Sequence, residues 1–307
     1  RGSFMAADLA PICAQRQDAL AARLRVRFPF VYIRTLTRTR GGRPVLALQL
    51  GQGHTKVLVT AGHHANEHIT STLCWALLEE YCAALEQDGE FGGVRASQLY
   101  HNAVLYLVPM VDPDGVDLVT GAITPGSAEF LRAQRLAAQF PGIPFPQGWK
   151  ANLDGVDLNL NYPAAWEDAV RIKAARGISA PAPRDWPGAQ PLSQPETAAL
   201  AAYTCCVHPD LALALHTQGS EIYHGFHGLE PPGSAQLAAD FAAVSGYRVC
   251  SVPPKSDNAG FKDWFVHRFR RPGFTIEAGF GENPLPEAQL PELLRAVRPI
   301  WARALLV

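Results

Sequence analysis

Short apolar segments typical of buried strands alternate with longer helix-like segments along almost the whole chain. The strand-like segments are short and rich in Val and Leu, whereas the helix-like segments repeat apolar residues every three or four positions. We expect strands at 31–39, 44–50, 56–61, 103–110, 211–215 and 274–278, and helices at 6–27, 69–85, 193–205, 234–245 and 286–306. This alternation, without repeats or linkers, predicts a single α/β domain with a mixed, mostly parallel central sheet flanked by helices.

Two segments lack such a pattern. Residues 115–148 are expected to be irregular, apart from a helix-like stretch at 128–139. Residues 163–191 form a long Pro-rich segment, and a segment of that length in a compact domain is usually functional or disordered. We expect the domain to span 5–307, because Arg1-Gly2-Ser3-Phe4 is typical of an expression-tag remnant.

The charge balance excludes several classes of partner. The formal net charge is -1 and no Lys/Arg block occurs, so we expect neither nucleic-acid binding nor attraction to an anionic membrane. No apolar run of membrane-spanning length and no secretion-type leader are recognisable, which predicts a cytoplasmic protein. The six cysteines include no C-x-x-C pair, and we expect reduced, mostly buried thiols.

Polar residues with metal-binding chemistry follow two of the expected strands. His64 and Glu67 come just after the strand at 56–61, and His216 comes directly after the strand at 211–215. Open α/β sheets place their active sites at the carboxyl ends of strands. Two His and one Glu with a fourth position open are the ligand set of a catalytic zinc. The alternative is that these are unrelated polar residues at strand ends.

A competing interpretation uses His68. Residues 64–68 match the H-x-x-E-H pattern of the inverzincin metallopeptidases, in which the motif lies inside a helix. Here a strand and Gly62 precede the motif, which disfavours that reading. We expect His63 and His68 to flank the cleft instead.

The chain resembles the zinc carboxypeptidase (M14-type) family, with matches in order along most of its length. One match departs from the family's P-x-x-N-P-D-G motif, because Asp112 replaces its Asn. The segments that carry the resemblance are 61–67, 108–115, 155–159, 215–217, 263–264 and 274–277.

The resemblance implies a role for each matching residue. It implies one Zn²⁺ per chain, held by His64, Glu67 and His216. Glu277 would be the general base and acid, and Asp157 would orient the His64 ring. Lys150 falls where the family usually has an Arg that stabilises the oxyanion.

Two departures from the family pattern bear on the substrate. An Asn-Arg pair usually grips the free carboxylate of the substrate, but this chain has Asn159-Leu160, and Leu cannot form a salt bridge. The Tyr that usually covers the substrate is replaced in the stretch 253–256. Both departures argue against ordinary carboxypeptidase activity. Candidate substrate-binding residues are Asn159, Lys262 and Lys255, with Arg184 as a weaker candidate.

The C-terminal half resembles one bacterial branch, the γ-D-glutamyl-diamino acid peptidases of murein, over residues 148–166, 181–187, 216–223, 228–232 and 260–286. This implies zinc-dependent hydrolysis of the bond between γ-D-Glu and meso-diaminopimelate in a small murein-derived peptide, inside the cell. The alternatives are a zinc carboxypeptidase or amidohydrolase of broader specificity and a catalytically silent binding protein.

Overall fold

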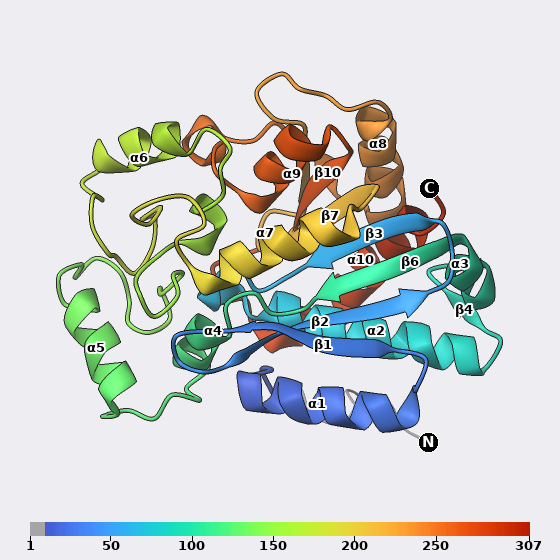
Figure 1. Cartoon of the computed structure of the whole chain (residues 1–307), viewed down its shortest axis with the longest axis horizontal. Coiled ribbons are helices and arrows are strands. Elements are labelled where there is room, and N and C mark those ends of the chain that lie inside the picture. Colours follow the sequence, from blue (N-terminus) through green and yellow to red (C-terminus); the bar gives the residue numbers. More distant parts are fainter. Residues whose placement is uncertain (1–9) are drawn as a thin grey trace.

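The computed structural model describes residues 10–307, apart from the side chain of Lys255. An eight-stranded sheet runs through the centre of the molecule, in the spatial order β1-β2-β6-β3-β7-β10-β8-β9 (Figure 1). Its strands are β1 Tyr32–Arg38, β2 Pro44–Gly51, β3 Thr55–Thr60, β6 Ala103–Val108, β7 Leu211–His216, β8 Glu221–His224, β9 Arg248–Val249 and β10 Gly273–Glu277. The predicted α/β class and all six predicted strands are confirmed.

The direction of the central strands fixes where the functional residues meet. The neighbouring strands β6, β3, β7 and β10 are parallel, whereas β1, β2 and β8 pair antiparallel toward the two sides of the sheet. The carboxyl ends of the four central strands therefore share one edge of the sheet. Glu277 at the end of β10 lies in register with His216 at the end of β7.

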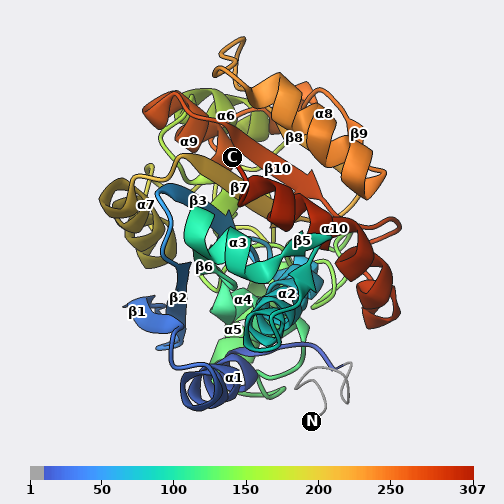
Figure 2. The same cartoon turned by 90° about the vertical axis from the view of Figure 1, so that its right-hand side faces the viewer.

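Helices cover both faces of the sheet, which appears between them in Figure 2. Residues alternate along β3, so that Val57 and Val59 pack in one core cluster and Leu58 in another. The first cluster includes α2, α8 and α10, and the second includes α7 and α9. Strands buried on both faces explain the continuous apolar runs in the sequence.

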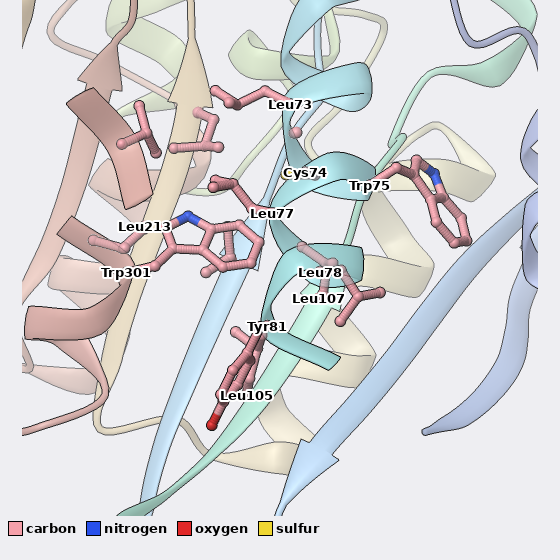
Figure 3. Packing of buried hydrophobic residues seen from close by; sticks show 14 of the residues in the cluster. Leu73, Cys74, Trp75, Leu77, Leu78, Tyr81, Leu105, Leu107, Leu213 and Trp301 are labelled. Carbon is pink, nitrogen blue, oxygen red and sulfur yellow. The ribbon is translucent and has the colours of Figure 1, made fainter. Parts of the chain in front are cut away.

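The long helix α2 anchors the larger core. Its residues Leu73, Leu77 and Tyr81 project toward the sheet, close to Leu213 of β7 and Trp301 of α10 (Figure 3). Burying a large apolar side chain typically contributes about 1.5–3 kcal/mol to the free energy of folding, so these contacts hold α2 firmly against the sheet. The helices are α1 Ala14–Arg27, α2 Ile69–Glu86, α3 Ala96–Asn102, α4 Pro113–Val119, α5 Ala128–Ala137, α6 Trp166–Ala174, α7 Pro195–Val207, α8 Ser234–Ser245, α9 Phe261–Phe269 and α10 Leu290–Ala304. Short 3-10 turns are η1 Ala65–Glu67, η2 Leu158–Leu160, η3 Pro254–Ser256 and η4 Glu287–Gln289, and a separate hairpin pairs β4 Glu90–Phe91 with β5 Val94–Arg95.

Residues 120–127 and 138–148 are irregular as predicted, but the prediction missed helix α4, which extends to Val119. This helix begins at Pro113 because Asp112 accepts the Gly115 N–H at 2.9 Å and Pro113 occupies the first helical position. The sequence also gave no prediction for α6, which lies inside the Pro-rich segment, or for α9. The helix predicted at 128–139 is confirmed as α5.

The first predicted helix begins later than expected. Residues 10–13 are not helical, and α1 begins at Ala14, whose N–H donates to Asp117. The predicted tag remnant at 1–4 and the first residues of the predicted helix lie outside the described residues.

The cysteines differ from the prediction in their burial. All six are free, but only Cys74 and Cys82 are buried, whereas Cys205 and Cys206 are exposed at the end of α7. The helix pattern of α7 directs these two away from its buried side. Among residues 10–307, no helix has the length and apolar character needed to cross a membrane.

Candidate active site

The turn after β3 brings two of the predicted ligands together. Gly62 has a φ of +64°, and a Cβ there would lie 2.6 Å from the Ser71 hydroxyl, so glycine is required at this close approach. The chain then enters η1, and the Ala65 N–H donates to the Lys150 carbonyl at 3.1 Å. This turn places the side chains of His64 and Glu67 on the same side.

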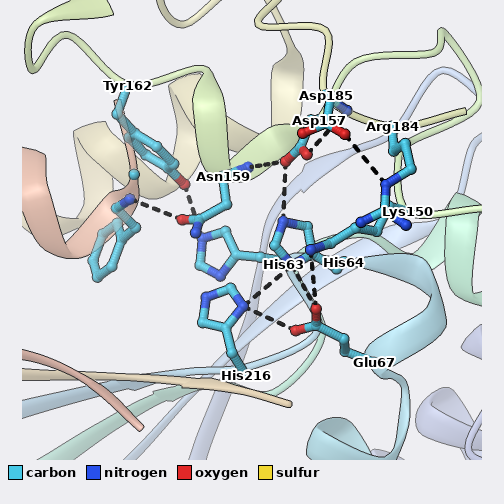
Figure 4. A network of polar contacts seen from close by, with 12 residues as sticks. His63, His64, Glu67, Lys150, Asp157, Asn159, Tyr162, Arg184, Asp185 and His216 are labelled. Carbon is cyan, nitrogen blue, oxygen red and sulfur yellow. Dashed lines mark hydrogen bonds and ion pairs between the residues drawn. The ribbon is translucent and has the colours of Figure 1, made fainter. Parts of the chain in front are cut away.

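The third predicted ligand reaches the same point from β7. His64 Nδ1 lies 3.0 Å from Glu67 Oε1, and His216 Nδ1 lies 3.0 Å from Glu67 Oε2. The two Nδ1 atoms are 3.2 Å apart, and all three residues are buried (Figure 4). One possible ligand atom from each residue lies within 4.8 Å of the others. The structure therefore brings His64, Glu67 and His216 together as the sequence predicted.

Asp157 holds the far side of the His64 ring. His64 Nε2 lies 3.0 Å from Asp157 Oδ1, and a hydrogen bond from Nε2–H leaves the lone pair of Nδ1 directed at Glu67 and His216. Although burial opposes it, the interaction with His64 and the charge of Lys150 hold the pKa of Asp157 well below its usual range. A ring fixed in this tautomer suits metal binding, so the donor set fits zinc.

Lys150 places a positive charge beside this cluster. Its Nζ lies 3.3 Å from Glu67 Oε1, and its backbone N–H donates to the Pro183 carbonyl at 2.8 Å. Burial lowers the pKa of Lys150, but the charges of Glu67 and Asp157 outweigh burial and raise it. The side chain is therefore a fixed cation at the wall of the cleft.

Glu277 enters the site from the end of β10. Burial first, and then the neighbouring charge of Glu67, raise the pKa of its carboxyl group to about 8. Such an elevated pKa is typical of carboxyl groups that exchange protons during catalysis. The pKa of Glu67 shifts the other way, because His64 and Lys150 outweigh burial and hold it well below its usual range.

These residues line a cleft in which two neighbouring chambers share part of their walls. The inner chamber, of about 320 Å³, contains the predicted ligands, Glu277 and most of the predicted substrate-binding residues. The outer chamber, of about 480 Å³, is bounded mainly by residues 142–148 and 281–283. Both chambers share Lys150, Arg184, Gln218 and Asn283 as walls.

The predicted substrate-binding residues differ in what they can still bind. Asn159 lines the inner chamber, and its Oδ1 accepts the Phe261 N–H at 2.9 Å, which leaves its amide nitrogen available. Lys262 also lines this chamber, but its Nζ is ion-paired with Asp263 and donates to the Gly225 carbonyl at 2.7 Å. The side chain of Lys255 lies outside the described part of the chain.

His63 and His68 do not flank the cleft as expected, because neither is among its lining residues. His63 is fully buried beneath it, and its Nε2 lies 3.1 Å from the Tyr162 hydroxyl. His68 Nδ1 lies 3.3 Å from Glu287, away from the predicted ligands. The H-x-x-E-H interpretation is therefore wrong.

Gln218, Tyr223 and Asn283 are among the residues that line the inner chamber and that sequence reasoning missed. Gln218 follows His216 by two positions, which was an available signal. Asn283 is held at the cleft by hydrogen bonds with Thr217, and no local sequence pattern predicts this position.

Comparisons with known proteins agree with this geometry. The family model described as zinc carboxypeptidase matches residues 19–298. The chain is 41% identical over 280 residues to the uncharacterised protein YqgT of Bacillus subtilis, covering 91% of this chain and 73% of that protein. It is 39% identical over 283 residues to gamma-D-glutamyl-L-diamino acid endopeptidase 1 of Lysinibacillus sphaericus, covering 92% of this chain and 69% of that one. The structure of bovine thrombin-activatable fibrinolysis inhibitor has the same fold, with a TM-score of 0.72, 16% identity and 97% coverage of both chains.

Proposed function

Since this chain belongs to the zinc carboxypeptidase family and is a metallopeptidase, we propose that it hydrolyses an amide bond in murein-type peptides, namely the γ-D-Glu–meso-diaminopimelate bond. The observation that carries the proposal is the convergence of His64, Glu67 and His216 beside Glu277. The substrate class is supported by the 39% identity to a γ-D-glutamyl-L-diamino acid endopeptidase.

His64, Glu67 and His216 are the residues that would hold one Zn²⁺ per chain. Bound there, zinc would supply Lewis-acid chemistry, which polarises a scissile carbonyl and lowers the pKa of a water molecule from about 15.7 toward about 7. The chain itself supplies the orientation, since Asp157 fixes the His64 ring and a Thr217 N–H donates to Glu67 at 3.2 Å.

Glu277 moves the proton in this proposal. Its carboxylate accepts a proton from the attacking water and delivers it to the nitrogen of the leaving amine. A bound dication would favour the ionised form of Glu277, because an opposite charge nearby lowers the pKa of a carboxyl group. The carboxyl would then be ready to accept a proton at neutral pH.

Lys150 stabilises the developing oxyanion. Its ammonium is fixed by Glu67 at 3.3 Å and lines both chambers of the cleft. A preorganised charge of this kind acts strongly because it needs no rearrangement during the reaction.

The alternative function is a carboxypeptidase or amidohydrolase of broader specificity on the same scaffold. Leu160, which stands where the family resemblance places an Arg, is 7% exposed and carries no charge. This position therefore supplies no cation for a C-terminal carboxylate, which argues against the carboxylate recognition of an ordinary carboxypeptidase. A recycling role inside the cell stays a prediction from the sequence.

One pair of substrates tests the proposal. The purified protein is incubated with L-Ala-γ-D-Glu-diaminopimelate and, separately, with a hydrophobic peptide that has a free C-terminus. We expect release of diaminopimelate and little cleavage of the second peptide. Elemental analysis of the untreated protein should show about one zinc per chain. Cleavage of the hydrophobic peptide alone would favour the alternative function.

A further inference from the structure

Arg184 stands where the two chambers of the cleft meet. It lines both chambers, together with Lys150, Gln218 and Asn283. The inner chamber contains Glu277, and Lys150 reaches within 3.3 Å of Glu67. A substrate that lies across both chambers must therefore pass this arginine.

Backbone contacts hold the segment that carries Arg184 in place. The Pro183 carbonyl accepts N–H groups from Lys150 at 2.8 Å and Ala151 at 3.0 Å. On the other side, the Asp157 N–H donates to the Trp186 carbonyl at 2.8 Å. The end of the Pro-rich segment is thus fixed to the loop that carries Lys150 and Asp157.

The residue next to Arg184 reinforces this position. Asp185 has a φ of +69°, an uncommon conformation for a residue with a side chain, and it persists because its surroundings hold it. Its N–H donates to Asp157 Oδ2 at 3.3 Å, and its carboxylate is ion-paired with Lys173. The backbone of Arg184 is therefore preorganised rather than free to move.

The guanidinium of Arg184 keeps most of its binding capacity. Its Nε lies 3.3 Å from Asp185 Oδ2, and among the described residues neither terminal nitrogen has a hydrogen-bond partner (Figure 4). The side chain is 40% exposed, so it faces the solvent of the cleft. Its charge acts on Lys150, so two cations lie close together at the junction. Such a pair favours an anion between or beside them, and a planar guanidinium suits a carboxylate in particular.

We propose that Arg184 is a specificity-determining residue that binds the free α-carboxylate of the γ-linked glutamyl residue on the acyl side of the scissile bond. This inference rests on the proposed function. In a γ-glutamyl amide, that carboxylate is separated from the scissile carbonyl by three carbons. With Lys150 at the carbonyl oxygen, the neighbouring guanidinium can reach the carboxylate. Substrates in which this group is an amide lose the charge-assisted hydrogen bonds.

The experiment uses three matched tripeptides. They are L-Ala-γ-D-Glu-diaminopimelate, its analogue with the α-carboxylate of D-Glu converted to a carboxamide, and its analogue amidated at the C-terminal carboxylate. Values of kcat/KM are compared for the wild-type zinc enzyme, Arg184→Gln, Arg184→Lys and Arg171→Gln. Arg171 is the matched control, because its side chain is 74% exposed on α6 and is not a lining residue of the cleft.

We expect the wild type to prefer the parent peptide over its α-carboxamide by about 30-fold. Arg184→Gln should lower kcat/KM for the parent by about 30-fold and leave the α-carboxamide nearly unchanged. Retained turnover of the α-carboxamide also shows that the variant is folded. Arg184→Lys should fall between the two, because an ammonium lacks the planar fork. Arg171→Gln should behave as wild type.

Four results would overturn the inference. The wild type could cleave the parent and its α-carboxamide equally well. Arg184→Gln could lower kcat/KM equally for all three peptides, or could instead remove the preference against C-terminal amidation, which would assign the arginine to the carboxylate on the amine side. A wild-type enzyme that cleaves none of the three rejects the proposed substrate and this inference with it.

Discussion

Two sets of buried carboxyl groups in this molecule respond in opposite ways to similar burial. In the cleft, Glu67 and Asp157 are almost fully buried, yet their pKa values are held well below the usual range. Behind the strand ends, Asp112 and Glu196 are equally buried, and their pKa values are raised, that of Glu196 to about 7. Burial alone raises the pKa of all four carboxyl groups.

The difference lies in the neighbours of each carboxyl group. His64 and Lys150 lie beside the cleft pair and favour its ionised form. The pKa of Asp112 is raised by burial and then by the charge of Glu196. One carboxyl oxygen of each of these two residues has no hydrogen-bond partner among the described residues. Glu67 and Asp157 thus stay charged beside cationic neighbours, whereas the second region favours the protonated form of its carboxyl groups.

Replacing the proton carrier should have the largest effect. We expect Glu277→Gln to lower kcat by at least about 1,000-fold while zinc stays bound, because Gln keeps the shape but cannot accept the proton. Steady-state kinetics and elemental analysis measure the two quantities. Glu90→Gln, at an exposed strand position, is the control. Near-normal turnover by Glu277→Gln would remove this residue from the mechanism.

Replacing Lys150, the cation at the wall of the cleft, should have the next largest effect. Lys150→Met should lower kcat by about 100- to 1,000-fold, since the oxyanion loses its charged partner. Lys150→Arg should retain much more activity, because a guanidinium can supply the same charge. Equal kinetics for the Met and Arg variants would show that the charge at this position is not used.

Neutralising the second region should change stability and not chemistry. A carboxyl group whose pKa is higher in the folded than in the unfolded state does not destabilise the fold at pH values below the unfolded-state pKa. Its destabilising effect grows as the pH rises toward the folded-state pKa. For Glu196 the pKa rises from 4.5 to about 7, so the destabilisation reaches about 3 kcal/mol at pH values above the folded-state pKa.

Glu196→Gln should therefore raise the free energy of unfolding by up to about 3 kcal/mol at pH 8 and change it far less near pH 4.5. Urea unfolding of the zinc-saturated wild type and variant across this pH range measures the difference, again with Glu90→Gln as control. A difference that does not change with pH would contradict the raised pKa.

Removing the carboxylate that orients the His64 ring should have the smallest effect. Asp157→Asn removes the charge that orients His64, and we expect a 10- to 100-fold loss of zinc affinity. Competition with a chromophoric chelator measures the affinity. Asp168→Asn, at a site paired with the exposed Arg171, should leave it unchanged. An unaltered affinity in Asp157→Asn would show that packing alone orients the ring.

Much of the site was predictable because its strands can be recognised from the local sequence. The runs ending near His64, His216 and Glu277 are apolar and short, and their alternation with helices implies parallel neighbours whose ends meet. The sequence pattern also identified the single-turn spacing of His64 and Glu67. These inferences need only local periodicity and one rule about sheets.

Other features depend on contacts between distant segments. The late start of α1 depends on Asp117, and the buried ion pair of Lys262 with Asp263 depends on how α9 packs. No periodicity predicted α6 within the Pro-rich segment, because prolines and loops around it hide a short helix.

The sequence by itself determined the α/β architecture, the strand-end positions of His64, Glu67, His216 and Glu277, and the family. The architecture and the strand-end positions follow from residue periodicity and spacing, which are properties of the local sequence, and the family follows from the resemblance of motifs that occur in the same order. Only the tertiary structure decided that Arg184 meets Lys150 at the junction of two chambers and that Asp112 and Glu196 stay uncompensated. Those outcomes come from long-range backbone hydrogen bonds and from the charges that folding brings close, and neither leaves a trace in local sequence.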